Sequence, residues 1–341
     1  ASDVYKRQMQ NAAGASRRRL ALGAGLAGIA SAALAAVSLM PAAPARQRSE
    51  VGALVAPGLE ARSADLRLIM VTTSEEVYHL VREGEDWVLP EKGGYRVRPE
   101  RIGEMVRALT SLRYARPMTR DERKFDRIGL GDPTQGGTGA LVEAGNGQGD
   151  VFAKLIVGYR RGSSYVRDPD DLQGWAATGE EMPPLQRGAR WLDLEVVELD
   201  PADIAEVRVR PAGSPGYVLN PADASGAQFK LAPPLDARPL AASFAPNLPA
   251  LALSRLSPSD VAAEKEIVGA AAAGDHVTRT RQGLEITARA WLSDERGWLT
   301  LSAAGNGSEA VNARTAGWAF ALTETDWGSF VMPLAAIVDP E

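Results

Sequence analysis

Apolar and polar residues alternate along several short segments of the chain, which is the pattern of half-buried β-strands. Alternation within residues 65–72 predicts a first strand. Segments 76–81 and 87–89 flank a polar turn at 83–86 and together predict a hairpin. The first elements of the folded part are therefore expected to be antiparallel strands.

The spacing then changes from every second residue to every third or fourth. Five apolar residues between Ile102 and Leu112 recur at this helical interval, and Pro99 suits the first position of a helix. We expect an amphipathic helix over residues 99–112, with its apolar stripe covering a sheet.

Strand patterns resume after a glycine-rich stretch at 125–138 that reads as a loop. Residues 140–144 and 151–159 are predicted strands, and the Gly-Asn-Gly sequence between them favours a hairpin turn. Residues 164–167 predict a further strand. Successive hairpins with an occasional helix indicate an α+β fold with mostly antiparallel sheets.

The second half of the chain repeats this order. Ala202 lies 138 residues after Ala64, Tyr217 lies 139 after Tyr78, and Phe229 lies 142 after Trp87, with similar residues around each pair. The later elements expected by this match are a helix at 248–256 and strands at 284–291 and 298–303. The pattern predicts either two similar α+β units, at 63–198 and 199–341, or a chance recurrence of a common order.

Residues 20–40 carry no charge and are long enough to cross a bilayer as a helix. Arg17, Arg18 and Arg19 precede them, so the body of the chain is expected on the far side of the membrane from the cytoplasm. The first interpretation of residues 9–45 is a cytoplasmic stub and a transmembrane anchor. The second is a cleaved export signal, because residues 43–45 form a small-x-small site and the arginines suit twin-arginine as well as Sec export.

Two flanking segments are set apart from the fold. Residues 1–8 lack an initiator methionine and resemble a translated adapter, so we treat them as a sequencing artefact. Residues 46–62 are expected to be a linker. We therefore predict a single-pass inner-membrane protein with its main body in the periplasm, with cleaved export as the alternative.

Composition narrows the possible chemistry. The chain has no cysteine, which excludes disulfides and thiolate metal sites. Its net charge is −5, and residues 1–45 contribute +4, so the remainder carries −9. An acidic body argues against nucleic-acid binding, because affinity for nucleic acid rests on neutralising phosphates.

The familiar catalytic motifs are missing from the sequence: it has no P-loop, no HExxH zinc motif and no GxSxG nucleophile elbow. Of the two histidines, His79 is expected to be a structural residue within a strand. His276 follows an alanine run and Asp275, and is expected in an exposed loop. We assign no catalytic, cofactor-binding or metal-binding residue, no cofactor, and no enzymatic activity.

One cluster of polar and aromatic residues is a candidate recognition patch: Tyr165, Arg167, Asp168, Asp170 and Trp175. A solvated turn closed by salt bridges is the simpler interpretation of the same residues. The acidic turn lacks the calcium-loop pattern of an EF-hand, since Pro169 and Leu172 interrupt it.

Several short motifs occur in order along the body of the chain: Trp87-Val88-Leu89, Gly94-Tyr95-Arg96-Val97, Leu109-Thr110-Ser111-Leu112, Phe125-Asp126-Arg127-Ile128-Gly129-Leu130, Lys154-Leu155-Ile156-Val157-Gly158, Tyr165-Val166-Arg167 and Trp191-Leu192-Asp193. Together they resemble the domain-of-unknown-function 4340 (DUF4340) family across residues 60–335. Arg96 departs from the family, which often has proline there. The resemblance implies one N-terminal transmembrane helix, a large exported region, and an accessory role beside ABC transport systems of the gliding-motility type. It supplies no site residues.

Three functions remain open at this stage. The first is a membrane-anchored periplasmic accessory or interaction protein that binds ABC transporter subunits or other envelope proteins. The second is a periplasmic hydrolase of envelope polymers, which requires a polar pocket that gathers His79 or His276. The third is a secreted binding module for a small ligand, which requires a deep pocket lined by aromatic residues.

Overall fold

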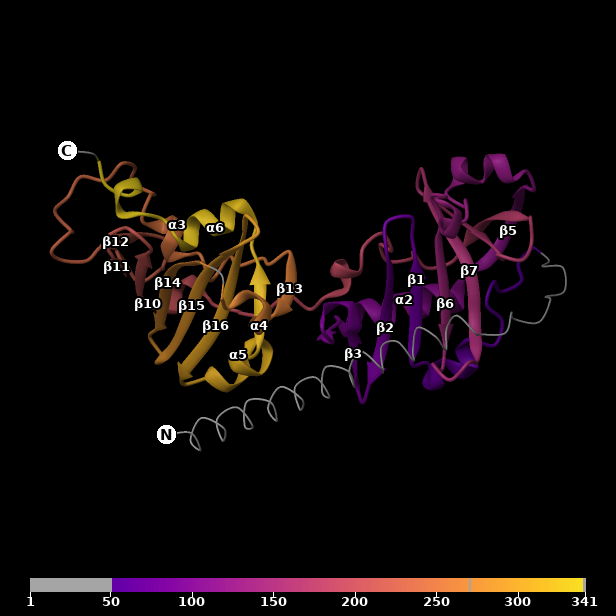
Figure 1. Ribbon diagram of the computed structural model, residues 1–341, viewed down its shortest axis with the longest axis horizontal. Coiled ribbons are helices and arrows are strands. Elements are labelled where there is room, and N and C mark those ends of the chain that lie inside the picture. The colour runs from indigo at the N-terminus through magenta and orange to yellow at the C-terminus, as the bar shows by residue number, and fades with distance from the viewer. Residues whose placement is uncertain (1–50, 270, 340–341) are drawn as a thin grey trace, which may run out of the picture. The chain divides into compact units, whose positions relative to one another are not determined.

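A computed structural model describes residues 51–269 and 271–339 (Figure 1). The chain forms two compact units, the first ending at Trp191 and the second beginning at Leu192. The expected artefact at 1–8 and the anchor or export signal at 9–45 lie outside the described residues. Within the described ranges, no helix is both long and apolar enough to span a bilayer.

The first unit is built on a nine-stranded antiparallel sheet with the order β4-β3-β2-β1-β6-β7-β8-β9-β5. The predicted strands and hairpins are confirmed, with β1 starting later than expected because a 3₁₀-helix occupies Glu60–Asp65. The strands are β1 (Leu68–Thr72), β2 (Val77–Glu83), β3 (Asp86–Leu89), β4 (Tyr95–Arg96), β5 (Arg113–Thr119), β6 (Ala140–Gly145), β7 (Val151–Arg160), β8 (Ser163–Arg167) and β9 (Gly174–Thr178).

Helix α2 (Pro99–Ser111) is the predicted amphipathic helix, with Pro99 in its first turn. Its buried residues Ile102, Met105 and Leu109 lie three or four positions apart, which places them on one side of the helix. The helix joins β4 to β5, which are the two opposite edges of the sheet, so the chain crosses the whole sheet in this connection.

The two faces of the first sheet differ in polarity. One face, here called the inner face, carries Val71 and its cross-strand partners Tyr78 and Val142, all at most 1% exposed. The opposite, outer face carries Met70 between His79 and Glu143. Side chains of a strand alternate between faces, so each neighbour in sequence changes face.

The outer face is partly covered by the segment between β5 and β6. This segment was predicted to be a plain loop, and it contains two 3₁₀-helices, η3 (Glu122–Ile128) and η4 (Pro133–Gln135). Phe125 and Leu130 from this segment pack on Leu141 and Ile156 of the sheet. The apolar residues within it are thus a small satellite core.

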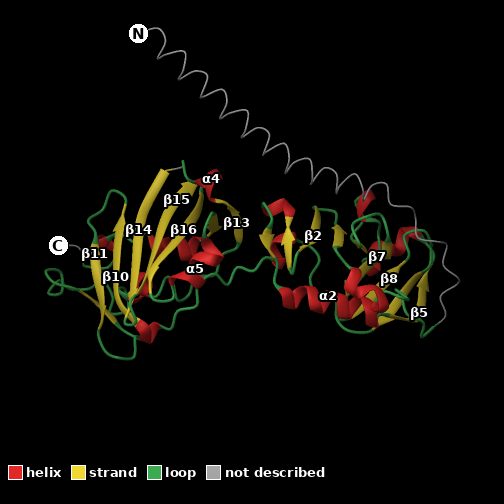
Figure 2. Ribbon diagram, turned by 90° about the horizontal axis from the view of Figure 1, so that it is seen from below, coloured by secondary structure: helices red, strands yellow, loops and turns green. Residues whose placement is uncertain are grey.

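The second unit has an eight-stranded antiparallel sheet with the order β12-β11-β10-β14-β15-β16-β17-β13 (Figure 2). Its strands are β10 (Ile204–Pro211), β11 (Tyr217–Pro221), β12 (Phe229–Leu231), β13 (Asp260–Ala263), β14 (Ala271–Thr280), β15 (Leu284–Ser293), β16 (Arg296–Gly305) and β17 (Trp318–Ala321). Its helices are α3 (Asn247–Ala250), α4 (Glu264–Ile267), α5 (Ser308–Thr315) and α6 (Glu324–Phe330). Its main core gathers residues such as Val207, Leu219 and Ile337.

The helix predicted at 248–256 is mostly wrong. The structure has α-helix only at Asn247–Ala250, and Leu251–Arg255 continues as hydrogen-bonded turns. Ala250, Leu251, Ala252 and Leu253 are all buried. A run of adjacent buried residues has no single apolar stripe, so it does not favour a regular surface helix.

The two sheets have the same strand order once β4 is set aside. Reading from the edge, β3-β2-β1-β6-β7-β8-β9-β5 corresponds strand for strand to β12-β11-β10-β14-β15-β16-β17-β13. In both, the first strand of the unit lies in the middle of the sheet, and the fourth of these strands lies at the far edge. The α+β prediction of mostly antiparallel sheets with a few helices is confirmed.

Candidate binding pocket of the first unit

A cavity of about 310 Å³ lies at one end of the first sheet. Its volume is at the lower end of the range for ligand pockets. It is lined by residues from the β1–β2 turn, the start of β6, the β7–β8 hairpin and the segment after β9: Thr73, Ser74, Glu75, Gly129, Thr138, Gly139, Ala140, Val157, Gly158, Tyr159, Arg160, Ser164, Glu181, Met182, Pro183, Pro184, Leu185 and Gln186.

The cavity exists because neighbouring strands have different lengths. Strand β6 begins at Ala140, which pairs with Val157 of β7. Strand β7 continues to Arg160, and Gly158–Arg160 pair with β8 on their other side. The end of the β7–β8 hairpin therefore extends beyond the start of β6, and the cavity lies beside it.

Residues 181–186 form one wall of the cavity. The buried Tyr78 hydroxyl donates a hydrogen bond to the Leu185 carbonyl oxygen at 2.9 Å, and Trp191 Nε1 donates to the same hydroxyl at 2.9 Å. Burial raises the pKa of Tyr78 well above its usual value, so the hydroxyl stays protonated and remains a donor. The bond to Leu185 holds the wall against the inner face of the sheet, and the bond from Trp191 holds the Tyr78 hydroxyl in place.

A second wall comes from the glycine-rich stretch, where side chains would not fit. A Cβ placed on Gly158 would collide with the Gly129 carbonyl and would lie 2.6 Å from the Ile128 oxygen. A Cβ on Gly139 would lie 2.6 Å from the Gly131 oxygen. Glycine thus lets two main-chain segments approach closely, and this wall presents backbone rather than side chains.

The chemical character of the lining is mixed and contains few charged groups. Glu75, Arg160 and Glu181 supply its charges, and Glu75 also pairs with the exposed Arg187 at 3.4 Å. Tyr159 is the lone aromatic residue among the lining residues. With one aromatic side chain, the lining offers little surface on which a ligand ring could stack.

The structure does not assemble the predicted recognition patch into one surface. Trp175 pairs with Val166, so it projects to the inner face, where its ring lies 5.1 Å from that of Tyr114. Tyr165 and Arg167 flank Val166 in sequence and project to the outer face. Of the five residues, none lines the cavity.

Arg167 is buried and holds the acidic turn together. Its Nη1 donates to the carbonyl oxygens of Pro169 and Asp171 at 3.1 Å, and to that of Asp168 at 3.4 Å. Its guanidinium also stands 4.6 Å from the centre of the Phe125 ring. Burial lowers the pKa of Arg167, and the surrounding carboxylates, Asp132 foremost, oppose this shift.

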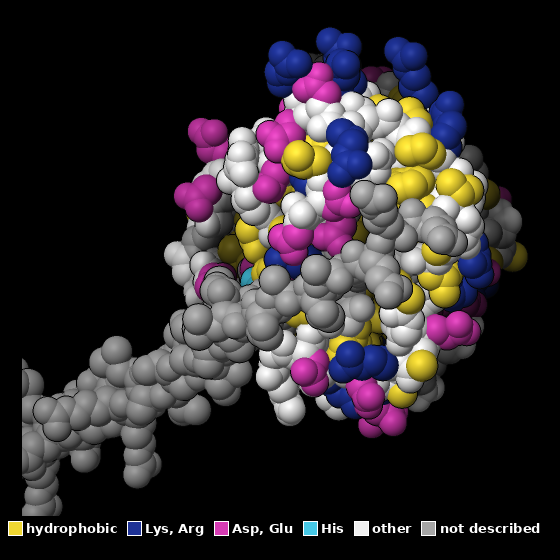
Figure 3. All heavy atoms as spheres, turned by 90° about the vertical axis from the view of Figure 1, so that its right-hand side faces the viewer, with side chains coloured by type: hydrophobic (Ala, Val, Ile, Leu, Met, Phe, Trp, Pro, Cys, Tyr) yellow, Lys and Arg dark blue, Asp and Glu magenta, His cyan; other side chains and the backbone are white. Residues whose placement is uncertain are grey.

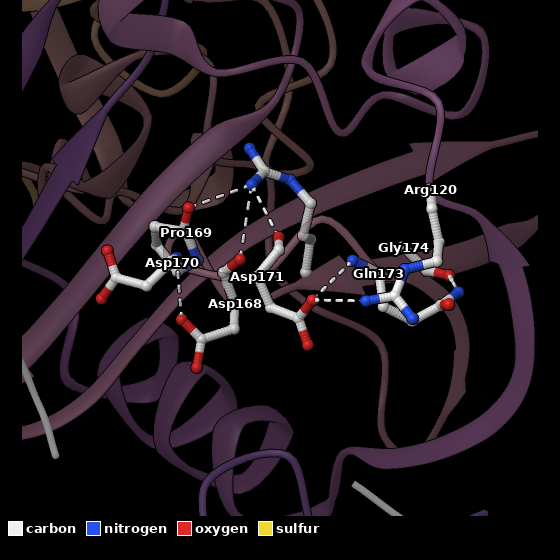
Figure 4. A network of polar contacts seen from close by, with 8 residues as sticks. Arg120, Asp168, Pro169, Asp170, Asp171, Gln173 and Gly174 are labelled. Carbon is white, nitrogen blue, oxygen red and sulfur yellow. Dashed lines mark hydrogen bonds and ion pairs between the residues drawn. The ribbon is translucent and has the colours of Figure 1, made fainter. Parts of the chain in front are cut away.

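The carboxylates of the turn mostly satisfy nearby backbone groups. Asp168 accepts from the Asp170 amide at 3.0 Å, and Asp171 accepts from the Gln173 amide at 3.1 Å. Arg120 lies 3.5 Å from Asp171 (Figure 4). These contacts support the simpler interpretation of a self-contained turn. Among the described residues, no group of histidine, aspartate and glutamate is placed to hold a metal ion.

His276 does not lie in an exposed loop, as its neighbours suggested, and this prediction is wrong. It is a fully buried residue of β14, and its Nε2 lies 2.8 Å from the Pro249 carbonyl oxygen. Its ring meets that of Phe330 edge to face at 5.1 Å. Burial lowers the pKa of His276 to about 4, so the ring is neutral at physiological pH. Adjacent residues of a strand project to opposite faces, so Asp275 lies on the other face of the sheet. Two adjacent polar residues in the sequence had suggested a loop.

His79 lies in β2, as predicted, with its side chain 6% exposed. Its Nδ1 lies 2.5 Å from Glu91 Oε1, and its main-chain amide donates to Glu91 Oε2 at 3.2 Å. The pair attaches the 3₁₀-helix η2 (Pro90–Lys92) to the sheet. Neither histidine lines the cavity.

One feature of the sequence could have indicated the cavity. The predicted strands at 140–144 and 151–159 differ in length, and Gly129, Gly139 and Gly158 all belong to the segments that meet there. The position of residues 181–186 beside the cavity could not be predicted from the sequence, because it depends on a hydrogen bond from the distant Tyr78.

Residues 87–270 match the family model described as a domain of unknown function, DUF4340. This match covers more than half of the chain. The chain belongs to the DUF4340 family. The DUF4340 range begins in β3 and ends after α4, so it takes in most of the first unit, including most of the cavity lining, and part of the second. No curated protein and no solved structure matches the chain.

Proposed function

We propose that this DUF4340 protein is a membrane-tethered binding protein of the bacterial envelope, and that the cavity of its first unit receives a segment of a partner protein. The observation that carries this proposal is the cavity beside Gly158–Arg160, where one wall presents main chain. Extended peptides are commonly recognised through main-chain hydrogen bonds at an exposed edge of a sheet, with pockets selecting side chains.

The tether rests on the sequence. The uncharged residues 20–40 follow three arginines, which is the arrangement of a segment that enters a membrane with its basic flank in the cytoplasm. The chain would then be anchored in the inner membrane, with its body in the periplasm. A subunit of an ABC transport system is the partner that we propose, on the strength of the family resemblance.

A histidine-dependent hydrolase is less well supported. His276 is enclosed between the sheet and Pro249, and His79 is held by Glu91, so neither ring is presented to the cavity. A small-molecule module that stacks its ligand on rings is also less well supported, since Tyr159 is the single aromatic side chain of the lining.

We also infer that the two units are copies of one ancestral unit. The support is the common strand order and the common pairing register, in which Val71 opposite Tyr78 corresponds to Val209 opposite Tyr217. The cavity then distinguishes the first copy, because the lining residues all belong to it.

Two neighbouring serines of β8 provide a matched test. Ser164 lines the cavity, whereas Ser163 does not and is exposed on the other face. In the full chain, Ser164→Trp fills the cavity and Ser163→Trp adds the same bulk outside it. The measurement is quantitative mass spectrometry of proteins captured with the tagged chain from detergent-solubilised membranes.

We expect the unmodified chain and Ser163→Trp to recover the permease or ATPase of an ABC system. We expect Ser164→Trp to recover at least tenfold less, corresponding to about 1.4 kcal/mol of lost binding. A photoreactive residue at Met182 should crosslink to the same subunit. Equal recovery by both variants, or recovery of no transport subunit, would overturn the proposal.

A further inference from the structure

Six basic side chains lie exposed along one short stretch of the first unit, which we call the basic strip: Arg113, Arg116, Arg120, Arg123, Lys124 and Arg127. The same stretch contains Asp121, Glu122 and Asp126, so residues 113–127 carry a net charge of +3. Residues 46–341 carry −9 in total, so the remainder of the body carries −12. The strip therefore stands out from an acidic body.

The basic strip follows the edge of the first sheet. Arg113 and Arg116 belong to β5, the last strand in the sheet order, and Arg123, Lys124 and Arg127 belong to η3. Figure 3 faces this end of the first unit and shows Lys and Arg side chains gathered along its upper part. The internal pairs of the strip involve Asp121, which lies near both Arg123 and Lys124. Arg120 of the strip also lies 3.5 Å from Asp171, outside it. When Asp171 is counted with the three acidic residues of the stretch, the strip still has a net charge of +2.

The segment that enters the first unit is fixed to this same edge. The Gly52 amide donates to the Tyr114 oxygen at 2.7 Å, and the Tyr114 amide donates to the Ala53 oxygen at 3.0 Å. The Arg113 guanidinium donates to the Gly52 oxygen at 2.9 Å. The first residues after position 50 are thus bonded directly to β5, the strand that carries part of the strip.

The length of the connection limits how far this edge can stand from a membrane. Only residues 41–50 separate the apolar segment from Val51. An extended chain spans at most about 3.6 Å per residue, so these residues reach about 36 Å when fully extended. Any shorter conformation brings the basic strip closer to the bilayer that holds the tether.

We propose that the basic strip docks on the anionic lipid headgroups of the bilayer in which this chain is anchored. The inference rests on the proposed tether. Headgroups whose phosphodiester is not balanced by a cationic group provide a negative surface, and each lysine or arginine close to such a surface strengthens attachment by about fivefold. The effect falls off over roughly 8 Å at physiological salt, so it requires the close approach that the short connection allows.

The charge of the body separates this partner from the alternatives. A nucleic acid would meet the acidic remainder of the chain as well as the strip, and repulsion would oppose binding. A bilayer meets only the edge that the tether directs toward it. An acidic protein partner is distinguished by the experiment below, because it would not depend on the lipid.

The absence of cysteine makes a site-specific distance measurement simple. Met118→Cys places a single thiol in β5, within the strip, for a fluorescent donor. The full chain is reconstituted in vesicles that carry an acceptor on a trace lipid headgroup. The lipids are either phosphatidylcholine alone or a mixture with about 30% phosphatidylglycerol, so that surface potential is the variable.

Two charge variants complete the design. Arg116→Glu with Lys124→Glu and Arg127→Glu reverses three charges of the strip. Lys230→Glu with Arg255→Glu and Arg281→Glu makes the same change at exposed positions of the second unit. Flotation of the vesicles measures anchoring separately from energy transfer.

In anionic vesicles we expect energy transfer to be high, to fall at about 0.5 M salt, and to be unchanged by the second-unit variant. The strip variant should lower the ratio of docked to undocked protein by at least about 100-fold, because three attractive charges are lost. Equal transfer in neutral and anionic vesicles would overturn the docking proposal while leaving the tether intact. A chain that fails to float with either vesicle would overturn the tether itself, and docking with it.

Discussion

Tyr78 and Tyr217 occupy the same position in the two sheets and make the same bond. Tyr78 lies opposite Val71 in the β1–β2 pair, and Tyr217 lies opposite Val209 in the β10–β11 pair. Each phenolic hydroxyl donates at 2.9 Å to a carbonyl oxygen of the segment that follows the last strand of its unit, at Leu185 and Met332. In each unit this bond fastens the final segment to the first hairpin.

The two bonds differ in one respect, which gives a prediction. Tyr78 also accepts from Trp191 Nε1, so Tyr78→Phe leaves a buried indole donor without its acceptor as well as removing the bond to Leu185. We expect Tyr78→Phe to destabilise the first unit by about 2 to 3 kcal/mol, and Tyr217→Phe to destabilise the second by about 1 kcal/mol. Hydrogen–deuterium exchange of peptides from each unit measures both. A smaller effect for Tyr78→Phe would contradict this account of Trp191.

His276 gives the second unit a stability that depends on pH. Burial lowers its pKa to about 4, against about 6.5 in an unfolded chain, so folding favours the neutral ring. Its contribution is fully present above pH 6.5 and is lost as pH falls toward 4, where the unfolded state binds the extra proton. The two values imply a loss of about 3 kcal/mol.

The non-titrating variant His276→Gln isolates this effect from the carboxylates that also titrate at low pH. Urea unfolding of the second unit should show the unmodified chain losing about 3 kcal/mol more than the variant between pH 6.5 and 4. Parallel pH profiles for the two proteins would show that the imidazole is not the cause.

Replacement of glycine by alanine is expected to have opposite effects on stability at Gly158 and at Gly103. In Gly158→Ala the new methyl group meets main-chain atoms of Ile128 and Gly129, which cannot move without displacing the cavity wall, so we expect a cost of about 2 kcal/mol. Gly103 lies within α2, where the nearest atom to a new methyl group is Arg107 Nη1 at 3.1 Å on a flexible side chain. Gly103→Ala should stabilise by up to about 1 kcal/mol.

Thermal unfolding checks this pair directly. A change of 1 kcal/mol shifts the midpoint of a unit of this size by about 2 to 4 °C. Gly158→Ala should lower the midpoint of the first unit and Gly103→Ala should raise it. Tolerance of Gly158→Ala would mean that the contact between the glycine-rich stretch and β7 is looser than the structure has it.

Local pattern was sufficient for most strands and for α2. The alternation at 65–72 and the helical spacing from Ile102 to Leu112 each concern one element and one buried face, and both elements are present. The same reasoning failed for His276, because a polar residue beside a charged one resembles a turn unless the opposite strand is known. Val209 and Ala288 lie opposite it and make its side of β14 the core.

The candidate site was less accessible to sequence reasoning. Proximity in sequence grouped Trp175 with Arg167, but the hairpin between β8 and β9 places them on different faces. The cavity is built from segments more than 100 residues apart, such as Thr73 and Met182. A periodic pattern within one segment cannot predict that these segments lie side by side. Their proximity depends on the strand order of the sheet and on the position of residues 181–186 against it.

The placement of β5 also determines when each unit is able to fold. After α2 the chain lays β5 at the far edge, where its partner strand is β9, about sixty residues later along the chain. The second unit repeats this with β13, which pairs with β17. The edge strands β5 and β13 cannot pair until β9 and β17 have been synthesised, so neither sheet is completed strand by strand as the polypeptide emerges. Pairing between strands distant in sequence is also slow. Each unit therefore exposes unpaired strand edges during synthesis until its final strand has formed.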